Sequence, residues 1–173
     1  IGTLNPIFIA ACLIIYLIGD HLDGMQAKRT GTGSALGEFC DHYLDAFNNG
    51  IIVFMMFTVF NIHHPAAMAG VIVISYWAHM AVFYEQFKTG WLTFERIGSL
   101  EGVLLSALLI GLTVLEPFSA LMTYRLAGTI TVAELFIAGS TLGAFMTFIQ
   151  TARRTPAIMA GYWIFVMLII VVA

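Results

Sequence analysis

The sequence predicts an all-α fold: a polytopic integral membrane bundle of hydrophobic helices. Hydrophobic residues make up 60% of the 173 residues and charged residues only 10%, whereas a soluble domain carries about 25% charged residues. The mean hydropathy is +0.94. Apolar runs close to the ~20 residues that a helix needs to cross the hydrocarbon core recur along the whole chain.

About six such runs are expected to form spans. The first, 4–20, is followed by a polar stretch that ends in the Gly31–Ser34 turn. The second, 37–60, ends shortly before Pro65. The third, 66–86, follows that proline and ends before the pair Thr89-Gly90. Proline is tolerated in the first turn of a helix, where its missing N–H has no partner to lose.

The remaining runs have similar boundaries. The fourth, 98–116, ends at Pro117, and the fifth, 128–150, precedes a basic stretch. The sixth, 157–173, begins after Pro156 and is slightly shorter than a full span. We expect one transmembrane domain over residues 1–173. Because Ile1 is not a start methionine and Ala173 falls inside an apolar run, we also expect the chain to be a fragment of a longer protein.

Charge predicts the orientation and excludes one class of partner. If the runs alternate in direction, six of the seven Lys and Arg residues fall in loops on one side, and only Arg125 falls on the other. Cytoplasmic loops carry the excess of Lys and Arg, so that side should be cytoplasmic. The formal net charge of -3 argues against nucleic-acid binding, which needs a basic surface. Cys12 and Cys40 form neither a disulfide framework nor a metal knuckle by their placement.

All four aspartates of the chain fall in one short stretch, at positions 20, 23, 41 and 45. Asp20 and Asp23 are three residues apart and would share a face if the first helix continues. Asp41 and Asp45 are four apart and share a face near the start of the second helix. The short loop between them brings both helix ends together, so the four carboxylates should converge at the membrane boundary.

Such a cluster is unfavourable without cations, because like charges repel and ionised groups near hydrocarbon are costly. Two divalent cations would balance four negative charges, and oxygen ligands suit Mg²⁺ or Mn²⁺. A two-metal site is also suited to in-line phosphoryl transfer. For any single aspartate, a solvated acidic loop or a helix cap remains the alternative; for all four together, metal binding is favoured.

These residues resemble the CDP-alcohol phosphotransferase (CDP-alcohol phosphatidyltransferase) family, whose motif is D-x2-D-G-x2-A-R-x8-G-x3-D-x3-D. This chain matches seven of the eight fixed positions at the right spacing. The matching residues are Asp20, Asp23, Gly24, Ala27, Gly37, Asp41 and Asp45. The departure is Lys28, where the family has Arg; Arg29 follows it. The stretches 23–30 and 37–42 are similar to the choline and ethanolamine phosphotransferase branch.

The resemblance implies a role for each matched position. The metals would be held by the four aspartates, Asp20, Asp23, Asp41 and Asp45, and Asp45 would also be the general base. His42, inside the motif, is a second candidate for proton removal. The nucleotide would be bound by Gly24, Ala27, Lys28, Arg29, Gly37 and Glu38. The family's first helix and its C-terminal part would be missing from this chain.

The implied reaction moves a phosphoalcohol from a CDP-alcohol, such as CDP-choline or CDP-ethanolamine, to a lipid hydroxyl such as that of diacylglycerol, and releases CMP. The partners would be this donor, the lipid acceptor and membrane lipids, and family members are often homodimers. One alternative is a phosphatidyltransferase of the same family that uses CDP-diacylglycerol. Another is a non-catalytic or transport membrane protein, with Lys28 as the mark of a degenerate site. Glu134, early in the fifth run, could serve structure or an acceptor pocket.

Overall fold

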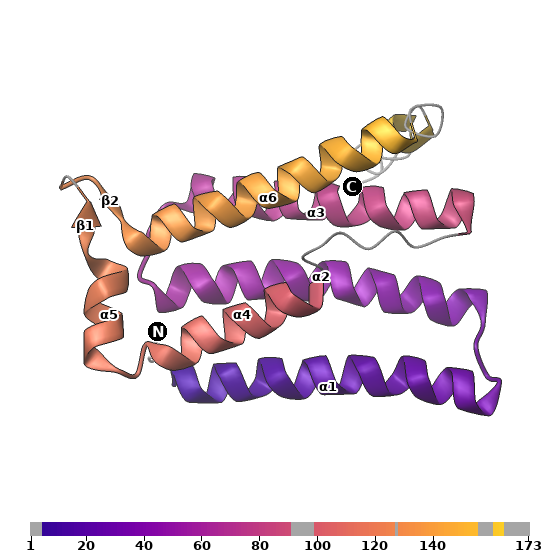
Figure 1. Cartoon of the computed structure of the whole chain (residues 1–173), viewed down its shortest axis with the longest axis horizontal. Helices are drawn as coiled ribbons and strands as arrows, with labels where there is room; N and C mark the ends of the chain where they lie inside the picture. The colour runs from indigo at the N-terminus through magenta and orange to yellow at the C-terminus, as the bar shows by residue number, and fades with distance from the viewer. Residues whose placement is uncertain (1–4, 91–98, 127, 156–160, 165–173) are drawn as a thin grey trace.

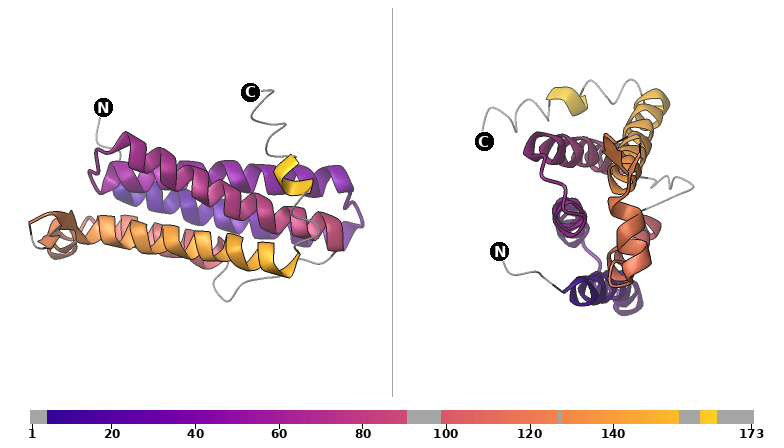
Figure 2. Two further views of the ribbon diagram at one scale, coloured as in Figure 1. Left: turned by 90° about the horizontal axis from the view of Figure 1, so that it is seen from above. Right: turned by 90° about the vertical axis from the view of Figure 1, so that its left-hand side faces the viewer.

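The structure is a computed structural model that describes residues 5–90, 99–126, 128–155 and 161–164. It confirms the predicted all-α membrane architecture. Long helices lie side by side as a bundle (Figure 1). Seen along the bundle, α1, α2 and α3 form one row, and α4 and α6 pack along one side of that row (Figure 2).

Three helices of 25 residues form that row: α1 (Pro6–Thr30), α2 (Ala35–Val59) and α3 (Pro65–Thr89). Local chemistry sets their ends. Asn5 caps α1 by accepting a hydrogen bond from the Ile7 amide, and Pro65 begins α3. Gly31 and Gly90 end α1 and α3 at φ +66° and +74°, in the left-handed region that glycine adopts without strain.

The second layer contains α4 (Ser99–Leu112) and α6 (Val132–Arg154). Between them lie the short helix α5 (Glu116–Thr123) and a two-stranded hairpin of β1 (Arg125–Leu126) and β2 (Ile130–Thr131). The strands are antiparallel, with Leu126 opposite Ile130. The axes of α4 and α5 differ by 111°, so α5 lies across one end of the bundle (Figure 1).

Length and hydropathy make α1, α3 and α6 candidate membrane spans, and α4 with α5 passes the same test as one bent pair. The protein is therefore an integral membrane protein. Helix α2 is as long as its neighbours, but Asp41, Asp45, Asn48 and Asn49 lower its hydropathy. The predicted fourth run, 98–116, is shorter as a helix and ends at Leu112. The sixth run lies almost wholly outside the described residues.

The helices bury apolar side chains in two groups. One group joins α1, α2 and α4 near the end crossed by α5, and includes Leu13, Met56 and Ile110. The other joins α3 to α6 around Phe148 and Tyr162. Many large apolar side chains elsewhere face outward, as expected where lipid is the solvent. The first group thus packs α1 and α2 against α4, and the second packs α3 against α6.

Candidate functional site

Charged and polar side chains gather at one end of the bundle, which we call the charged end. It is formed by the last turns of α1, α3 and α6 and the first turns of α2 (Figure 1). Five of the described cations lie there: Lys28, Arg29, Lys88, Arg153 and Arg154. Arg125 lies in β1 at the opposite end, and Arg96 is outside the described residues. The distribution agrees with the one expected from the sequence.

Asp41, His42 and Asp45 form a cluster at the charged end. One ligand atom from each lies within 4.8 Å of the other two, and all three residues are half-buried. The i, i+4 spacing on α2 brings the two carboxylates to one face, as the sequence predicts. Ser34 caps α2 by accepting a hydrogen bond from the Gly37 amide at 3.1 Å, which fixes where the helix begins relative to the cluster.

The first helix contributes the other two aspartates. Because α1 continues to Thr30, Asp20 and Asp23 both lie on helix. Asp20 lies within hydrogen-bonding reach of Asp45, and it interacts electrostatically with Asp41 and Asp23. Two carboxylates at this range repel unless a proton or a cation lies between them. The structure thus places Asp20 and Asp41 within electrostatic reach of each of the other aspartates.

This donor set fits divalent cations of the Mg²⁺ or Mn²⁺ kind. Carboxylate oxygens are the ligands that these ions prefer, and the cluster supplies them from two helices. The imidazole of His42 is a less typical ligand for such hard ions. Its own surroundings suggest another role.

The His42 ring is held by packing rather than by hydrogen bonds. It stacks on Phe83 of α3 with ring centroids 4.0 Å apart. Both ring nitrogens are buried and have no hydrogen-bond partner among the described residues. The nearest carboxylate oxygen, Oε1 of Glu38, is 3.8 Å from Nε2, which is too long for a hydrogen bond. Neither ring nitrogen is therefore committed to a partner among the described residues.

The other residues with a predicted nucleotide role lie in the same charged end, on the last turns of α1 and the first turn of α2. Lys28 and Arg29 are exposed on the last turn of α1. Ala27 lies one residue earlier, and its carbonyl accepts hydrogen bonds from the Gly31 and Thr32 amides. Glu38 accepts a hydrogen bond of 2.7 Å from the Gln86 side chain of α3. That bond ties the start of α2 to the end of α3.

The two motif glycines have different surroundings. A Cβ atom at Gly24 would meet no other atom within 4 Å, so the space beside it is open. A Cβ at Gly37 would lie 3.2 Å from the Ser34 hydroxyl that caps α2. Gly37 therefore has a local reason to lack a side chain, in addition to any approach of a ligand.

Two further residues contact the site and were not predicted from the sequence: Tyr16 and Gln86. The Tyr16 hydroxyl donates a 2.5 Å hydrogen bond to Asp45, from α1 to α2. Tyr16 could have been predicted from the sequence, because it precedes Asp20 by one helical turn and therefore lies on the same face of α1. Gln86 could not be found in this way, since its contact with Glu38 depends on how α3 packs on α2.

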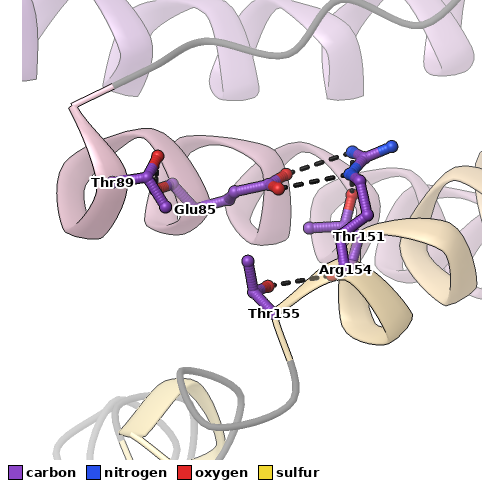
Figure 3. A network of polar contacts seen from close by, with 5 residues as sticks. All are labelled: Glu85, Thr89, Thr151, Arg154 and Thr155. Atoms are coloured by element: carbon purple, nitrogen blue, oxygen red, sulfur yellow. Dashed lines mark hydrogen bonds and ion pairs between the residues drawn. The ribbon is translucent and has the colours of Figure 1, made fainter.

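A partly buried ion pair also lies near this end, between α3 and α6 (Figure 3). Arg154 Nη2 is 3.1 Å from Glu85 Oε2, and Arg154 Nε donates to Oε1 at 3.2 Å. Arg154 also donates to the hydroxyl of the buried Thr151. The forked geometry suits the planar guanidinium. This ion pair joins the ends of α3 and α6. The aspartates lie on the other two helices, α1 and α2.

Glu134 has a structural role at the far end. Its carboxylate accepts hydrogen bonds from the amide and hydroxyl of Thr131, and its own amide donates to that hydroxyl. This reciprocal arrangement is a capping box that begins α6. Of the two roles left open for Glu134, the structure supports the structural one.

Comparison with known proteins gives a consistent result. The model of the family described as CDP-alcohol phosphatidyltransferase matches residues 3–138. An uncharacterized class-I member of that family from Schizosaccharomyces pombe is 30% identical over 109 residues, which is 60% of this chain and 27% of the relative. A second uncharacterized class-I member, from Dictyostelium discoideum, is 31% identical over 102 residues, 55% of this chain and 25% of the relative.

A third relative carries a more specific name. It is the CDP-diacylglycerol–serine O-phosphatidyltransferase of Encephalitozoon cuniculi, 47% identical over 34 residues, 20% of this chain and 9% of that protein. The aligned segments span about a quarter of the length of the two class-I relatives. No solved structure matches the chain.

Proposed function

The chain belongs to the CDP-alcohol phosphatidyltransferase family, and on that premise we propose that it carries the catalytic site of a phospholipid-synthesising phosphotransferase. The donor is a CDP-alcohol of the CDP-choline or CDP-ethanolamine kind, and the acceptor is a lipid hydroxyl such as that of diacylglycerol. The observation that supports this most is the cluster of Asp41, His42 and Asp45 joined by Asp20 of the neighbouring helix.

The location of the cluster suits a reaction between a water-soluble and a membrane-bound substrate. The aspartates lie at the charged end of a membrane bundle, where the nucleotide arrives from water and the lipid from the bilayer. We assign this end to the cytoplasm, because five of the described cations lie there.

Divalent cations, Mg²⁺ or Mn²⁺, would be held as a pair by Asp20, Asp23, Asp41 and Asp45, and would supply neutralisation of phosphoryl charge. Lys28 and Arg29, both exposed on the last turn of α1, are placed to approach the diphosphate. Lys28 offers a point charge in place of a guanidinium fork. Gly24 leaves open space beside the motif backbone for the nucleotide.

In the proposed reaction the acceptor oxygen bonds to the β-phosphorus of the donor, and the bond from that phosphorus to the oxygen of CMP breaks. The hydroxyl proton passes to Asp45. His42 is the second candidate for this proton, since its buried ring nitrogens have no partner among the described residues. CMP leaves, and the phosphoalcohol stays on the lipid.

A second candidate function is the same transfer with CDP-diacylglycerol as the donor and a small alcohol as the acceptor. The short but closer similarity to a serine phosphatidyltransferase favours it. Both functions use the same aspartates, so a donor panel separates them.

The test measures CMP release by the full-length protein in detergent, with Mg²⁺ or Mn²⁺ present or chelated. Diacylglycerol is supplied with CDP-choline or CDP-ethanolamine, and CDP-diacylglycerol with serine, inositol or glycerol 3-phosphate. We expect metal-dependent release with the first set, lowered at least ~100-fold in Asp45→Asn, as is typical for loss of a general base. Glu116→Gln, an exposed carboxylate at the far end, is the matched control and should retain activity.

Release only with CDP-diacylglycerol would move the assignment to the second candidate. No release with any pair from a folded, full-length protein would favour a non-catalytic or transport role.

A further inference from the structure

An open pocket of about 230 Å³ lies between α1 and α2, directly beside the aspartate cluster. Its lining comes from both helices. It is almost entirely apolar, with Phe8, Cys12 and Leu13 on α1 and Ile51, Ile52 and Met55 on α2 among its walls. Phe8, Cys12 and Ile51 are exposed at the surface, which places the pocket at the lipid-facing side of the helices.

The polar lining residues lie together at one end of this pocket. They are Tyr16 and Asn48, and the Asn48 side chain lies within hydrogen-bonding reach of the Tyr16 hydroxyl. Tyr16 in turn donates its hydrogen bond to Asp45. Tyr16 therefore lies between the apolar part of the pocket and Asp45, the carboxylate that we propose receives the proton of the acceptor hydroxyl.

The helical register gives the pocket a direction. Phe8, Cys12, Tyr16 and Asp20 follow one another at intervals of four residues, so they lie on one face of α1. From Phe8 to Tyr16 the helix rises about 12 Å. A molecule that is apolar over this length and polar at the Tyr16 end would match the pocket along its whole extent.

From these contacts we propose that the pocket between α1 and α2 binds an acyl chain of the acceptor lipid, with the hydroxyl-bearing end of that lipid at Tyr16 and Asp45. This inference rests on the proposed function and specifies its acceptor site. The proposed binding site of the CDP-alcohol donor is separate from this pocket, because Lys28, Arg29 and Gly24 lie beyond Asp20 on α1. In this arrangement Tyr16 is a positioning residue that separates the apolar chain from the carboxylate.

The test uses a diacylglycerol that carries a photoreactive diazirine in one acyl chain. It is added to the full-length protein in phosphatidylcholine nanodiscs, and cross-linked peptides are identified by mass spectrometry. We expect cross-links in segments 8–13 and 51–55, competed by unlabelled diacylglycerol. Phosphatidylcholine, which has no free hydroxyl on its glycerol, should not compete.

A pair of substitutions on α1 provides the matched control. Cys12→Trp fills the pocket, whereas Ile15→Trp places the same indole ring at an α1 position that is 69% exposed and outside the lining. Displacing about two methylene groups from the pocket should weaken diacylglycerol binding roughly tenfold. The cross-link yield should fall by that factor in Cys12→Trp and stay unchanged in Ile15→Trp.

Three results would overturn the proposal: equal cross-linking in both variants, competition by CDP-diacylglycerol but not by diacylglycerol, or cross-links elsewhere because another segment or a second copy covers the pocket. The readout needs no turnover. If the cross-links behave as expected but no donor gives CMP release, the acceptor site stands and the proposed reaction fails.

Discussion

The two members of the Glu85–Arg154 ion pair differ in burial, so removing one or the other should change the free energy of unfolding by different amounts. The side chain of Glu85 is 6% exposed, and that of Arg154 is 34% exposed. If the arginine is removed, the carboxylate stays in a site that water cannot reach. If the glutamate charge is removed, the guanidinium can still turn toward water.

We therefore expect Arg154→Met to lower the free energy of unfolding by about 3 kcal/mol, the low end for an uncompensated buried charge. Glu85→Gln should cost less. Thermal unfolding in detergent measures both, with the exposed neighbour Arg153→Met as the control. Equal losses for Arg153→Met and Arg154→Met would contradict this account.

At the residue scale, the sequence predicts which side chains share a helix face, but it does not predict contacts between residues on different helices. The intervals from Asp20 to Asp23 and from Asp41 to Asp45 predicted shared helix faces. The structure brings Asp41 and Asp45 together on α2 and places Asp20 of α1 next to Asp45. The stacking of His42 on Phe83 has no counterpart in local spacing. It depends on the angle at which α3 crosses α2, which only tertiary packing sets.

At the scale of the element, α2 and α3 are in tight contact at Gly50. A Cβ atom placed there would lie 2.9 Å from Cζ of Tyr76 on the facing helix. Small residues let two membrane helices approach closely. The tyrosine ring occupies the space that a side chain at position 50 would need.

Gly50→Ala should consequently destabilise the protein by about 1–3 kcal/mol, the usual cost of overpacking. In a Tyr76→Ala background the same change should cost little, since the ring is gone. Unfolding of the two single variants and the double variant gives the coupling energy. Gly70→Ala, where a Cβ meets nothing within 4 Å, is the control, and a similar loss there would refute the steric explanation.

Element boundaries were predictable where a cap or a turn residue marks them. Pro65 begins α3 and Gly31 ends α1, as the sequence indicates. The predicted start of the fifth run, residue 128, lies four residues before the helix, because apolar character alone does not separate a hairpin from a helix. The helix begins at Val132, and the Thr131–Glu134 capping box, which a T-x-x-E pattern can reveal, explains that start.

The bend between α4 and α5 was predicted only in part. Pro117 was expected to end the fourth run, but α4 already ends at Leu112 and Pro117 lies inside the first turn of α5. Proline is compatible with a first turn, so it marked the next helix rather than the end of the previous one. The 111° between the axes follows from how α5 packs on the bundle end, which composition does not encode.

At the scale of the whole molecule, the asymmetry of charge predicts one orientation in the membrane. With Cys12→Ala, the exposed Cys40 is the remaining thiol of this segment, at the charged end. We expect a membrane-impermeant maleimide to leave it unlabelled in intact cells and to label it after permeabilisation. Thr129→Cys, in the exposed hairpin at the opposite end, should show the reverse. Labelling of Cys40 in intact cells would reject the cytoplasmic assignment.

The hairpin of β1 and β2 is a suitable site for inserting a soluble domain into this membrane bundle. Its strands have two residues each, and Gly128 is exposed with φ +74° and open space around it. Exposed loop tips of small residues tolerate inserted sequence well. A rigid soluble domain spliced between Gly128 and Thr129 would project from the face opposite the charged end, giving electron cryomicroscopy a recognisable mass for particle alignment without touching the aspartates.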